Sequence, residues 1–595
     1  MLQLDQTALL LDGLRPPPGM EIDVAVGTTF TLDLAALLSI PVAATFASNI
    51  EEDPADLLET IRRYADRTVL FCQAGAISVP PKYRAALTFV EQTVVEVQKP
   101  SSGIFHPKMW AVRFKGPAGV THRVLVMSRN LTFDRSWDVI VRLDEADAGD
   151  TTMATGGVVD LLRYLPEKTA RSLSKPQADL LEDLSGSLAQ VELAVPEPFT
   201  RGTLRPFLSR NDGQPFRFSC DHALAISPFL TTSAAKQFIK GTKYWAGVIS
   251  RPAAIDASAD GLRTAERVLR LKDAVLDAER TIDDTFDVDD DPESATDPTR
   301  DLRGLHAKTY VQDHGQSATA WIGSANLTTG AFSTNVELLV ELTGPLAEVG
   351  VDALFSPTPE KKNLSWFVED HPLPDEGLEI EDLDEISELD GHSFDLASRD
   401  IVVALEGNGD EWDAHLSIEP WTPPPEAVVR ARLLTLSDDS LVAVTEGRAT
   451  WSAIPQTQIT PFVVFELKIG PSVRRTLVRA RLEGDPEDRR KSVIADAIAS
   501  RDDFFRYLAA LLGADLGVGA GSGSGMFTGG WTGSGVVVRV LEDLLTTASR
   551  EPARLASLDE TLKQLQRRPD VASIVPDEFH ALWDAVYTAC KGTIR

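Results

Sequence analysis

The chain has few cysteines and no long apolar run. Its three cysteines, Cys72, Cys220 and Cys590, are widely spaced in 595 residues, which excludes a disulfide framework and a cysteine-based zinc cluster. No run of about 18 apolar residues occurs, so no segment is expected to span a membrane. The N-terminal segment lacks a basic stretch and a small-residue cleavage site, unlike a secretion signal. We therefore expect a cytoplasmic protein.

Basic residues are also scarce. The chain has 58 Lys and Arg against 89 Asp and Glu, a formal net charge of −31. Residues 283–301 contribute −8 and residues 369–395 contribute −12, so two short segments hold −20 of the −31. We interpret both as solvated loops or linkers. The net charge therefore does not exclude a basic cleft elsewhere in the chain.

The length predicts about four domains. Alternating strand and helix patterns indicate two α/β units at 1–200 and 201–395, followed by a β-rich region at 396–485 and a helical region at 486–595. The local patterns predict a strand at 21–33 and a helix that ends at Ile40, before Pro41. They also predict helices at 156–164, 176–192, about 261–281 and 487–513. The glycine-rich segment 516–535 is expected to be a flexible loop, and no GxxxxGK[ST] pattern occurs anywhere in the chain.

An internal repeat about 200 residues apart is the most informative feature. In both copies His-x-Lys opens a strand, a second strand ends in Ser-x-Asn-Leu-Thr, and a third begins with an acid. The equivalent residues are His106, Lys108, Ser128, Asn130 and Asp138 in the first copy and His306, Lys308, Ser324, Asn326 and Glu337 in the second.

These residue types are suited to phosphodiester chemistry. A histidine oriented by a carboxylate can attack phosphorus, and a second, protonated histidine can donate to the leaving oxygen. Lysine and asparagine supply donors for the non-bridging oxygens. Because each copy supplies only one such histidine, two copies that face each other make one complete site. No metal and no cofactor are required, and the sequence shows no obvious metal-binding cluster.

The two copies resemble the phospholipase D superfamily, whose paired HxK motifs form a bilobed α/β fold with one active site between the lobes. The second copy matches the full signature, with four residues between Lys308 and Asp313 and with the segment Asn335-x-Glu337. In the first copy Arg113 stands at the position of Asp313, and Met127 at that of Gly323. This copy is similar to the His-Lys-Asn form of tyrosyl-DNA phosphodiesterase and related nucleases. The resemblance covers about residues 20–350.

The resemblance also implies roles for these residues. His106 would form the covalent phosphohistidine and His306 would act as general acid, although the near symmetry of the copies leaves the order open. Asp138 and Glu337 would orient the histidines. Ser128 and Ser324 would either donate to phosphate or support the asparagines. Asp313 is expected to close a turn, and the remaining seven histidines are expected to be structural.

Three functions remain open at this stage. The first is a metal-independent nuclease, acting on DNA rather than RNA, with Arg123, Arg129 and Arg135 placed to meet phosphates or lying as solvated surface. The others are a phospholipase D-type lipid hydrolase or transferase and a non-catalytic nucleic-acid-binding scaffold. Relatives that carry a long accessory region look like restriction or anti-phage effectors that work beside a separately encoded helicase or ATPase. The acidic segment 283–301, which ends five residues before His306, could inhibit such an enzyme by occupying the phosphate path.

Overall fold

The computed structural model describes most of the chain up to residue 490 and parts of the C-terminal region. The described ranges are 10–46, 61–81, 83, 86–117, 119–133, 136–208, 213–273, 304–355, 363–378, 387–408, 411–486, 489–490 and a few later residues that include α19 (Asp577–Cys590). The acidic segment 283–301, the glycine-rich segment 516–535 and most of the predicted helix at 487–513 lie outside these ranges. No helix of the described residues is long and apolar enough to cross a membrane.

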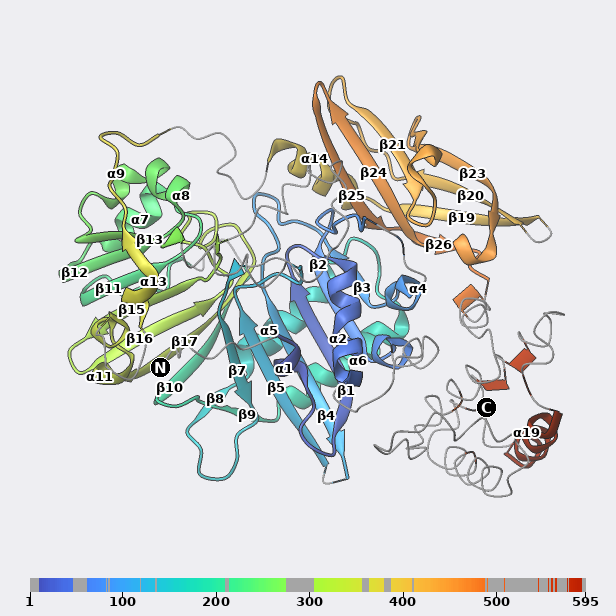
Figure 1. Cartoon of the computed structure of the whole chain (residues 1–595), viewed down its shortest axis with the longest axis horizontal. Helices are drawn as coiled ribbons and strands as arrows, with labels where there is room; N and C mark the ends of the chain where they lie inside the picture. The colour runs from blue at the N-terminus through green and yellow to red at the C-terminus, as the bar shows by residue number, and fades with distance from the viewer. Residues whose placement is uncertain are drawn as a thin grey trace.

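The chain is a mixed α/β protein whose two largest sheets repeat one strand order (Figure 1). The first sheet has the order β3 (Val94–Val97), β2 (Thr68–Gln73), β1 (Glu21–Thr29), β4 (Met109–Gly116), β5 (Gly119–Met127) and β7 (Ile140–Asp144). The second has β18 (Val368–Asp370), β13 (Arg267–Leu271), β12 (Thr242–Ile249), β11 (Cys220–Ile226), β15 (Thr309–His314), β16 (Ser317–Gly323), β17 (Glu337–Pro345) and β10 (Arg201–Phe207). Without the edge strands β18 and β10 the two orders are identical, with three parallel strands followed by three antiparallel ones.

Apolar faces of the two sheets share one core with the helices α5 (Gly156–Tyr164) and α6 (Lys175–Leu188). The outer face of the first sheet packs against α1 (Leu10–Leu14), α2 (Leu34–Phe46) and α4 (Leu87–Val90). The outer face of the second sheet packs against α7 (Thr232–Ile239), α8 (Pro252–Ala257) and α9 (Ala259–Leu262). Burial of one leucine side chain contributes roughly 1.5–3 kcal/mol to the free energy of folding. Apolar contacts on both faces therefore hold each sheet in place.

Two local predictions are wrong. Helix α2 does not end before Pro41 but continues to Phe46, so the helix tolerates one main chain N–H lost at the proline. The long helix predicted at 261–281 does not form in its described part, residues 261–273, which hold the end of the short helix α9 and the strand β13. Residues 274–281 lie outside the described ranges. That strand pairs with β12 and β18 and buries three of its five side chains, and tertiary burial overrides the helical spacing of the segment.

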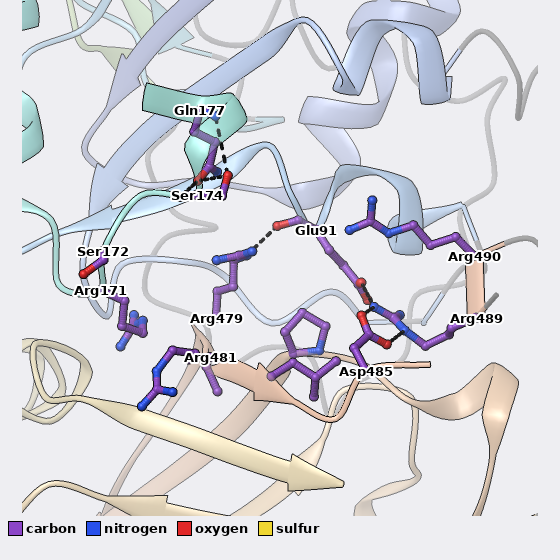
Figure 2. A pocket seen from close by; sticks show the side chains of 13 residues that line it. Glu91, Arg171, Ser172, Ser174, Gln177, Arg479, Arg481, Asp485, Arg489 and Arg490 are labelled. Carbon is purple, nitrogen blue, oxygen red and sulfur yellow. Dashed lines mark hydrogen bonds and ion pairs between the residues drawn. The ribbon is translucent and has the colours of Figure 1, made fainter. Parts of the chain in front are cut away.

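The short strands predicted after residue 400 form two four-stranded sheets around a separate core. One sheet is β23 (Arg448–Pro455), β20 (Glu411–Ile418), β19 (Ile401–Asn408) and β26 (Arg481–Glu483), and the other is β22 (Val442–Ala443), β21 (Val428–Leu433), β24 (Phe462–Ile469) and β25 (Ser472–Arg479). This region meets the first α/β unit directly, because the main chain N–H of Leu477 donates to the Ile77 carbonyl at 3.1 Å. Arg489 adds a buried ion pair to Glu91 at 2.8 Å (Figure 2).

Between the second sheet and this region the chain forms short elements. They are α11 (Leu346–Val349), α12 (Val351–Phe355), α13 (Leu364–Phe367) and α14 (Glu388–Ala397). A small two-stranded sheet of β8 (Thr152–Ala154) and β9 (Glu192–Ala194) lies beside the first unit. The four-domain division by residue number stays a prediction.

Candidate active site

Backbone pairing between the two repeats begins at the second motif. Strand β14 (Gly304–Leu305), which ends just before His306, pairs in parallel with β6 (Ser136–Trp137), which ends just before Asp138. The main chain N–H of His306 also donates to the Trp137 carbonyl at 3.0 Å. The second histidine therefore lies next to the acid of the first repeat.

The same arrangement occurs at the first motif. Phe105 forms a parallel bridge with Val336, and the N–H of His106 donates to the Val336 carbonyl at 2.9 Å. Val336 directly precedes Glu337. The first histidine therefore lies next to the acid of the second repeat, and the two repeats cross over at the site.

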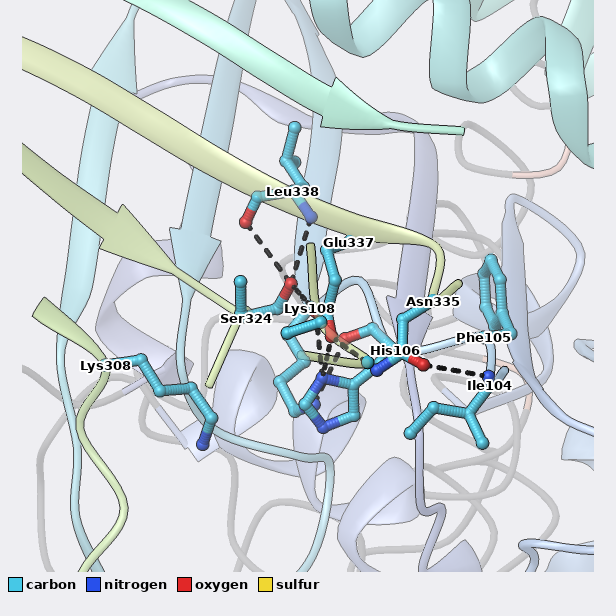
Figure 3. A network of polar contacts seen from close by, with 12 residues as sticks. Ile104, Phe105, His106, Lys108, Lys308, Ser324, Asn335, Glu337 and Leu338 are labelled. Carbon is cyan, nitrogen blue, oxygen red and sulfur yellow. Dashed lines mark hydrogen bonds and ion pairs between the residues drawn. The ribbon is translucent and has the colours of Figure 1, made fainter. Parts of the chain in front are cut away.

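The side chains complete this crossed pairing. Nδ1 of His106 lies 2.9 and 3.0 Å from the two carboxylate oxygens of Glu337 (Figure 3). Nδ1 of His306 lies 2.9 Å from Oδ1 of Asp138. A carboxylate on Nδ1 holds the ring orientation and the tautomer, which assigns the reacting role to Nε2. The structure thus brings each predicted histidine together with one predicted acid, and their catalytic roles stay a prediction.

The serines hold the acids, an alternative that the sequence did not raise. Ser128 Oγ donates to Asp138 Oδ1 at 2.9 Å. Ser324 Oγ donates to Glu337 Oε2 and accepts the main chain N–H of the next residue, Leu338, at 2.9 Å. The side-chain amide of Asn335 donates to Glu337 Oε1 at 3.1 Å. Sequence reasoning misses this role of Asn335, although the residue belongs to the motif.

Each lysine folds back onto its own motif. Nζ of Lys308 donates to the His306 carbonyl at 2.9 Å and lies 3.3 Å from His306 Nε2. Nζ of Lys108 donates to the His106 carbonyl at 3.1 Å. Both lysines are fully buried. Their ammonium groups therefore lie close to the histidines, where a bound phosphate would place its negative oxygens.

Both asparagines follow the fifth strand of their repeat in equivalent turns. Asn130 and Asn326 are 4% and 2% exposed. The residue after Asn130 donates its main chain N–H to the Thr29 hydroxyl, and the residue after Asn326 donates to the Ser227 hydroxyl, both at 2.9 Å. Sequence reasoning misses these two hydroxyls because they lie far upstream of the motifs. Aligning strand 21–29 with strand 220–226 would place them at equivalent positions.

The buried site favours a neutral His306. Burial and the charges of Lys308 and Lys108 together lower the pKa of His306 to about 4, although Asp138 acts in the opposite direction. Burial alone would raise the pKa of Asp138, but His306, Lys308 and Ser128 hold it below its usual value. The pair is therefore a neutral imidazole beside a carboxylate anion in the unliganded protein. Lys108, from the other repeat, is among the charges that lower the pKa of His306.

We expect the His306 ring to titrate with a midpoint near pH 4, well below the ordinary value of about 6.5. As the pH falls, the unfolded chain binds this proton near pH 6.5 and the folded chain only near pH 4. The free energy of unfolding therefore decreases as the pH falls between these two values, and the titration of His306 has no such effect above about pH 6.5. NMR of histidine-labelled protein checks this, with His306→Gln to assign the resonance. A His306 midpoint at or above pH 6 would contradict the neutral pair.

Arg123 is not available to substrate phosphates. It is 3% exposed, its Nε donates to Asp144 at 2.5 Å, and Nη1 donates to the carbonyls of Gly13 and Arg15 at 2.8 Å. Arg129 is partly buried and donates to a nearby main chain carbonyl. The third arginine of this expected cluster, at position 135, lies outside the described residues.

Arg113 and Asp313 occupy equivalent strand positions and both tie a strand to a helix. Arg113 pairs with Asp183 on α6 at 2.5 Å. Asp313 accepts the main chain N–H of Val351 at the start of α12 at 3.1 Å and contacts His222 Nδ1 at 3.0 Å. The expectation that Asp313 closes a turn is therefore wrong, since it joins β15 to helix α12. The exchange of aspartate for arginine between the copies leaves the site's geometry untouched.

In the part of the chain that the structure describes, no group of three or more His, Cys, Asp or Glu side chains is placed to hold a metal ion. No family model matches the sequence, and no curated protein matches it significantly. Among solved structures, yeast tyrosyl-DNA phosphodiesterase is similar with 12% identity and a TM-score of 0.32, over 58% of this chain and 87% of that chain. A polyphosphate kinase from Porphyromonas gingivalis is similar with 12% identity and a TM-score of 0.28, over 58% of this chain and 43% of that chain. Both belong to the phospholipase D superfamily, which the two motifs resemble.

Proposed function

We propose that the chain is a metal-independent phosphodiesterase that cleaves nucleic acid through a phosphohistidine intermediate. The observation that supports this most directly is the crossed pair of buried histidines, each with Nδ1 on a carboxylate of the other repeat. Two such histidines supply both a nucleophile and an acid. The lysines and asparagines supply the donors that stabilise charge on phosphorus oxygens.

In the first step Nε2 of His106 attacks phosphorus with its lone pair. The P–O bond to the leaving group breaks, and His306 donates its proton to that oxygen. In the second step water attacks the phosphohistidine, His306 takes a proton from that water, and the P–N bond breaks to return His106. The same two steps balance if His306 is the nucleophile and His106 the acid, so the assignment of these roles stays a prediction.

The charge state of His306 limits the acid step. The imidazole is neutral in the unliganded protein, so it must gain a proton when substrate binds. A phosphodiester anion beside Lys308 offsets the ammonium charge that lowers the pKa of His306. Substrate binding would thereby raise this pKa and prepare the acid, and the rate should follow a bell-shaped pH profile.

The surroundings of the first motif favour nucleic acid over lipid. Phe133, three residues after Asn130, is 64% exposed, and Thr329 occupies the equivalent position of the second repeat. An exposed aromatic ring beside a phosphate site can stack on a nucleobase. DNA is the preferred candidate over RNA because the first motif has the His-Lys-Asn form.

Cleavage that resists a metal chelator is the expected result for this function. Labelled single-stranded DNA, double-stranded DNA and RNA are incubated with the full chain in excess EDTA, beside phosphatidylcholine. At least one nucleic acid should be cleaved as fast as in the presence of Mg²⁺, because Lys108, Lys308 and the asparagines supply the charge stabilisation that a metal ion supplies in other nucleases.

The outcomes of this assay separate the alternatives. Activity that EDTA abolishes and Mg²⁺ restores would contradict the proposal. Cleavage of lipid without cleavage of nucleic acid would instead support the phospholipase reading. Saturable nucleic-acid binding without cleavage of any substrate would support a non-catalytic scaffold.

A restriction-type or anti-phage role beside a separately encoded helicase or ATPase is part of this proposal. It is supported by the resemblance of the motifs and by the lack of an ATP-binding loop pattern in the sequence. The β-rich and C-terminal regions would then serve recognition or assembly. Infection of cells that express the wild-type chain or a His106→Ala chain tests this role, with phage resistance expected for the wild type only.

A further inference from the structure

A cavity of about 250 Å³ lies where the first α/β unit meets the β-rich region (Figure 2). It shares no lining residue with the candidate active site. Arg481 stands at its edge and pairs with Asp400 at 3.1 Å. Five arginines line the cavity against two carboxylates, a local excess of +3 in a chain of net charge −31. The arginines are Arg171, Arg479, Arg481, Arg489 and Arg490, and the carboxylates are Glu91 and Asp485.

Both lining carboxylates are already used by one arginine. Arg489 is 2% exposed and pairs with Glu91 at 2.8 Å and with Asp485 at 2.7 Å. Arg171 forms an ion pair with the buried carboxylate of Glu96, which does not line the cavity. Arg171 Nη1 also donates to the carbonyls of Ala397 and Arg399 at 3.1 and 3.0 Å. The structural role of Arg171 and Arg489 is therefore to join the α/β unit to the β-rich region. Because Arg489 pairs with both lining carboxylates, neither is left to neutralise another arginine of the cavity.

Arg479 and Arg490 lack such a partner. Among the residues that the structure describes, no carboxylate lies within ion-pair distance of either guanidinium group. Arg479 Nε donates to the main chain carbonyl of Glu91 at 2.5 Å, and Arg490 donates to the side-chain oxygen of Gln92. Burial lowers the pKa of Arg479 to about 10. The carboxylates of Glu91 and Glu96 act on this positive charge only from beyond ion-pair distance, so a bound anion would stabilise a guanidinium group that is partly withdrawn from water.

We propose that this cavity is a binding site for a phosphoryl group, held between Arg479 and Arg490. A guanidinium group matches two phosphate oxygens at once and stays charged at every physiological pH. Ser174, the N-cap residue of the 14-residue helix α6, also lines the cavity, so the positive end of a helix faces the same space.

The size of the cavity limits the ligand. Its volume is below the roughly 300–1,000 Å³ of sites for drug-sized molecules. The ligand is therefore inorganic phosphate or pyrophosphate, or the phosphate end of a nucleotide. That phosphate can come from a free nucleotide or from the end of a nucleic-acid strand, and both sources present the same group to the arginines.

Calorimetric titration of the full chain with sodium pyrophosphate tests the site. Every protein in the series carries His106→Asn and His306→Asn, which prevents turnover but leaves Lys108 and Lys308 in place. In this background we expect saturable binding, and its dependence on Arg479 and Arg490 assigns it to the cavity. Arg479→Gln and Arg490→Gln should each weaken it by at least about ten-fold, because each removes one charge-assisted contact.

Arg475→Gln is the matched control. Arg475 lies four residues before Arg479 on the same strand, but it pairs with Asp438 and Glu466, outside the cavity. Both acids keep a second arginine when it is replaced. This variant should bind pyrophosphate as the parent does. Arg479→Gln also loses the hydrogen bond to the Glu91 carbonyl, so its melting temperature without ligand is measured beside the titration. Arg490→Gln provides an independent test if that variant does not fold.

The same titration with AMP and with 5′-phosphorylated and 5′-hydroxyl oligonucleotides distinguishes the two sources. Arg479-dependent binding of AMP but of neither oligonucleotide identifies a free small ligand. Arg479-dependent binding of the 5′-phosphorylated strand over the 5′-hydroxyl strand identifies a strand end. The proposal is overturned if pyrophosphate, AMP and the phosphorylated strand all fail to bind, or if Arg479→Gln and Arg490→Gln bind as the parent does. Neither result bears on catalysis, which the EDTA assay of the wild-type chain tests separately.

Discussion

Alanine in place of His106 or His306 is expected to slow phosphodiester cleavage by roughly 10³-fold or more, because each imidazole has its own part in bond breaking. The two variants should differ in what accumulates. Loss of the acid, His306 in the present assignment, should trap a phosphohistidine on a substrate with a good leaving group, which departs without a proton, because the water of the second step then lacks its base. Loss of the nucleophile should trap nothing. Single-turnover kinetics and mass spectrometry of the protein measure both effects.

His371→Ala is the matched control for these variants. His371 also contacts a carboxylate, Asp256, at 2.8 Å, but it lies outside the repeat motifs. Its replacement should leave the cleavage rate unchanged within about two-fold. Full activity in both the His106 and His306 variants would refute a paired histidine site. An adduct that accumulates only in the His106 variant would exchange the two roles and leave the paired site in place.

The second large effect is expected at the two carboxylates. Asp138→Asn and Glu337→Gln should each lower the cleavage rate roughly 10–100-fold, because each leaves one imidazole without the group that orients it. Their effects on His306 should differ. Asp138 raises the pKa of His306, so Asp138→Asn should move its midpoint further below about 4. Glu337→Gln should leave that midpoint in place, since Glu337 contacts the other histidine.

The His306 resonance and the pH dependence of the rate measure this difference. Asp256→Asn, which removes the carboxylate partner of His371, is the control and should change neither. If Glu337→Gln moved the His306 midpoint and Asp138→Asn did not, the acids would pair within their own repeats. That result would refute the crossed arrangement.

Local patterns predicted the strands around both motifs, because alternating and continuous apolar runs report burial directly. They failed for β13, where pairing with two neighbouring strands decides the structure. They left Arg123 either beside substrate phosphates or on the solvated surface, since a sequence does not show that Asp144 and two distant carbonyls use its buried guanidinium group. Spacing along the chain predicts which residues lie near the same strand end. It does not predict which of these side chains form ion pairs or hydrogen bonds with a neighbouring segment.

The sequence by itself determined that the chain carries two His-Lys-Asn sets, each followed by an acid, at equivalent positions of two similar α/β units. It could not decide which acid serves which histidine, because the two copies are chemically almost the same. Only the docking of the two repeats decides this, through contacts between residues 231 and 168 positions apart. The arginine-lined cavity likewise exists only after folding, since Arg171 and Arg490 come from segments that meet when the β-rich region packs on the first sheet. Side chains with the same local pattern acquire different partners because burial removes water, and each charge must then find its counterpart in the tertiary structure.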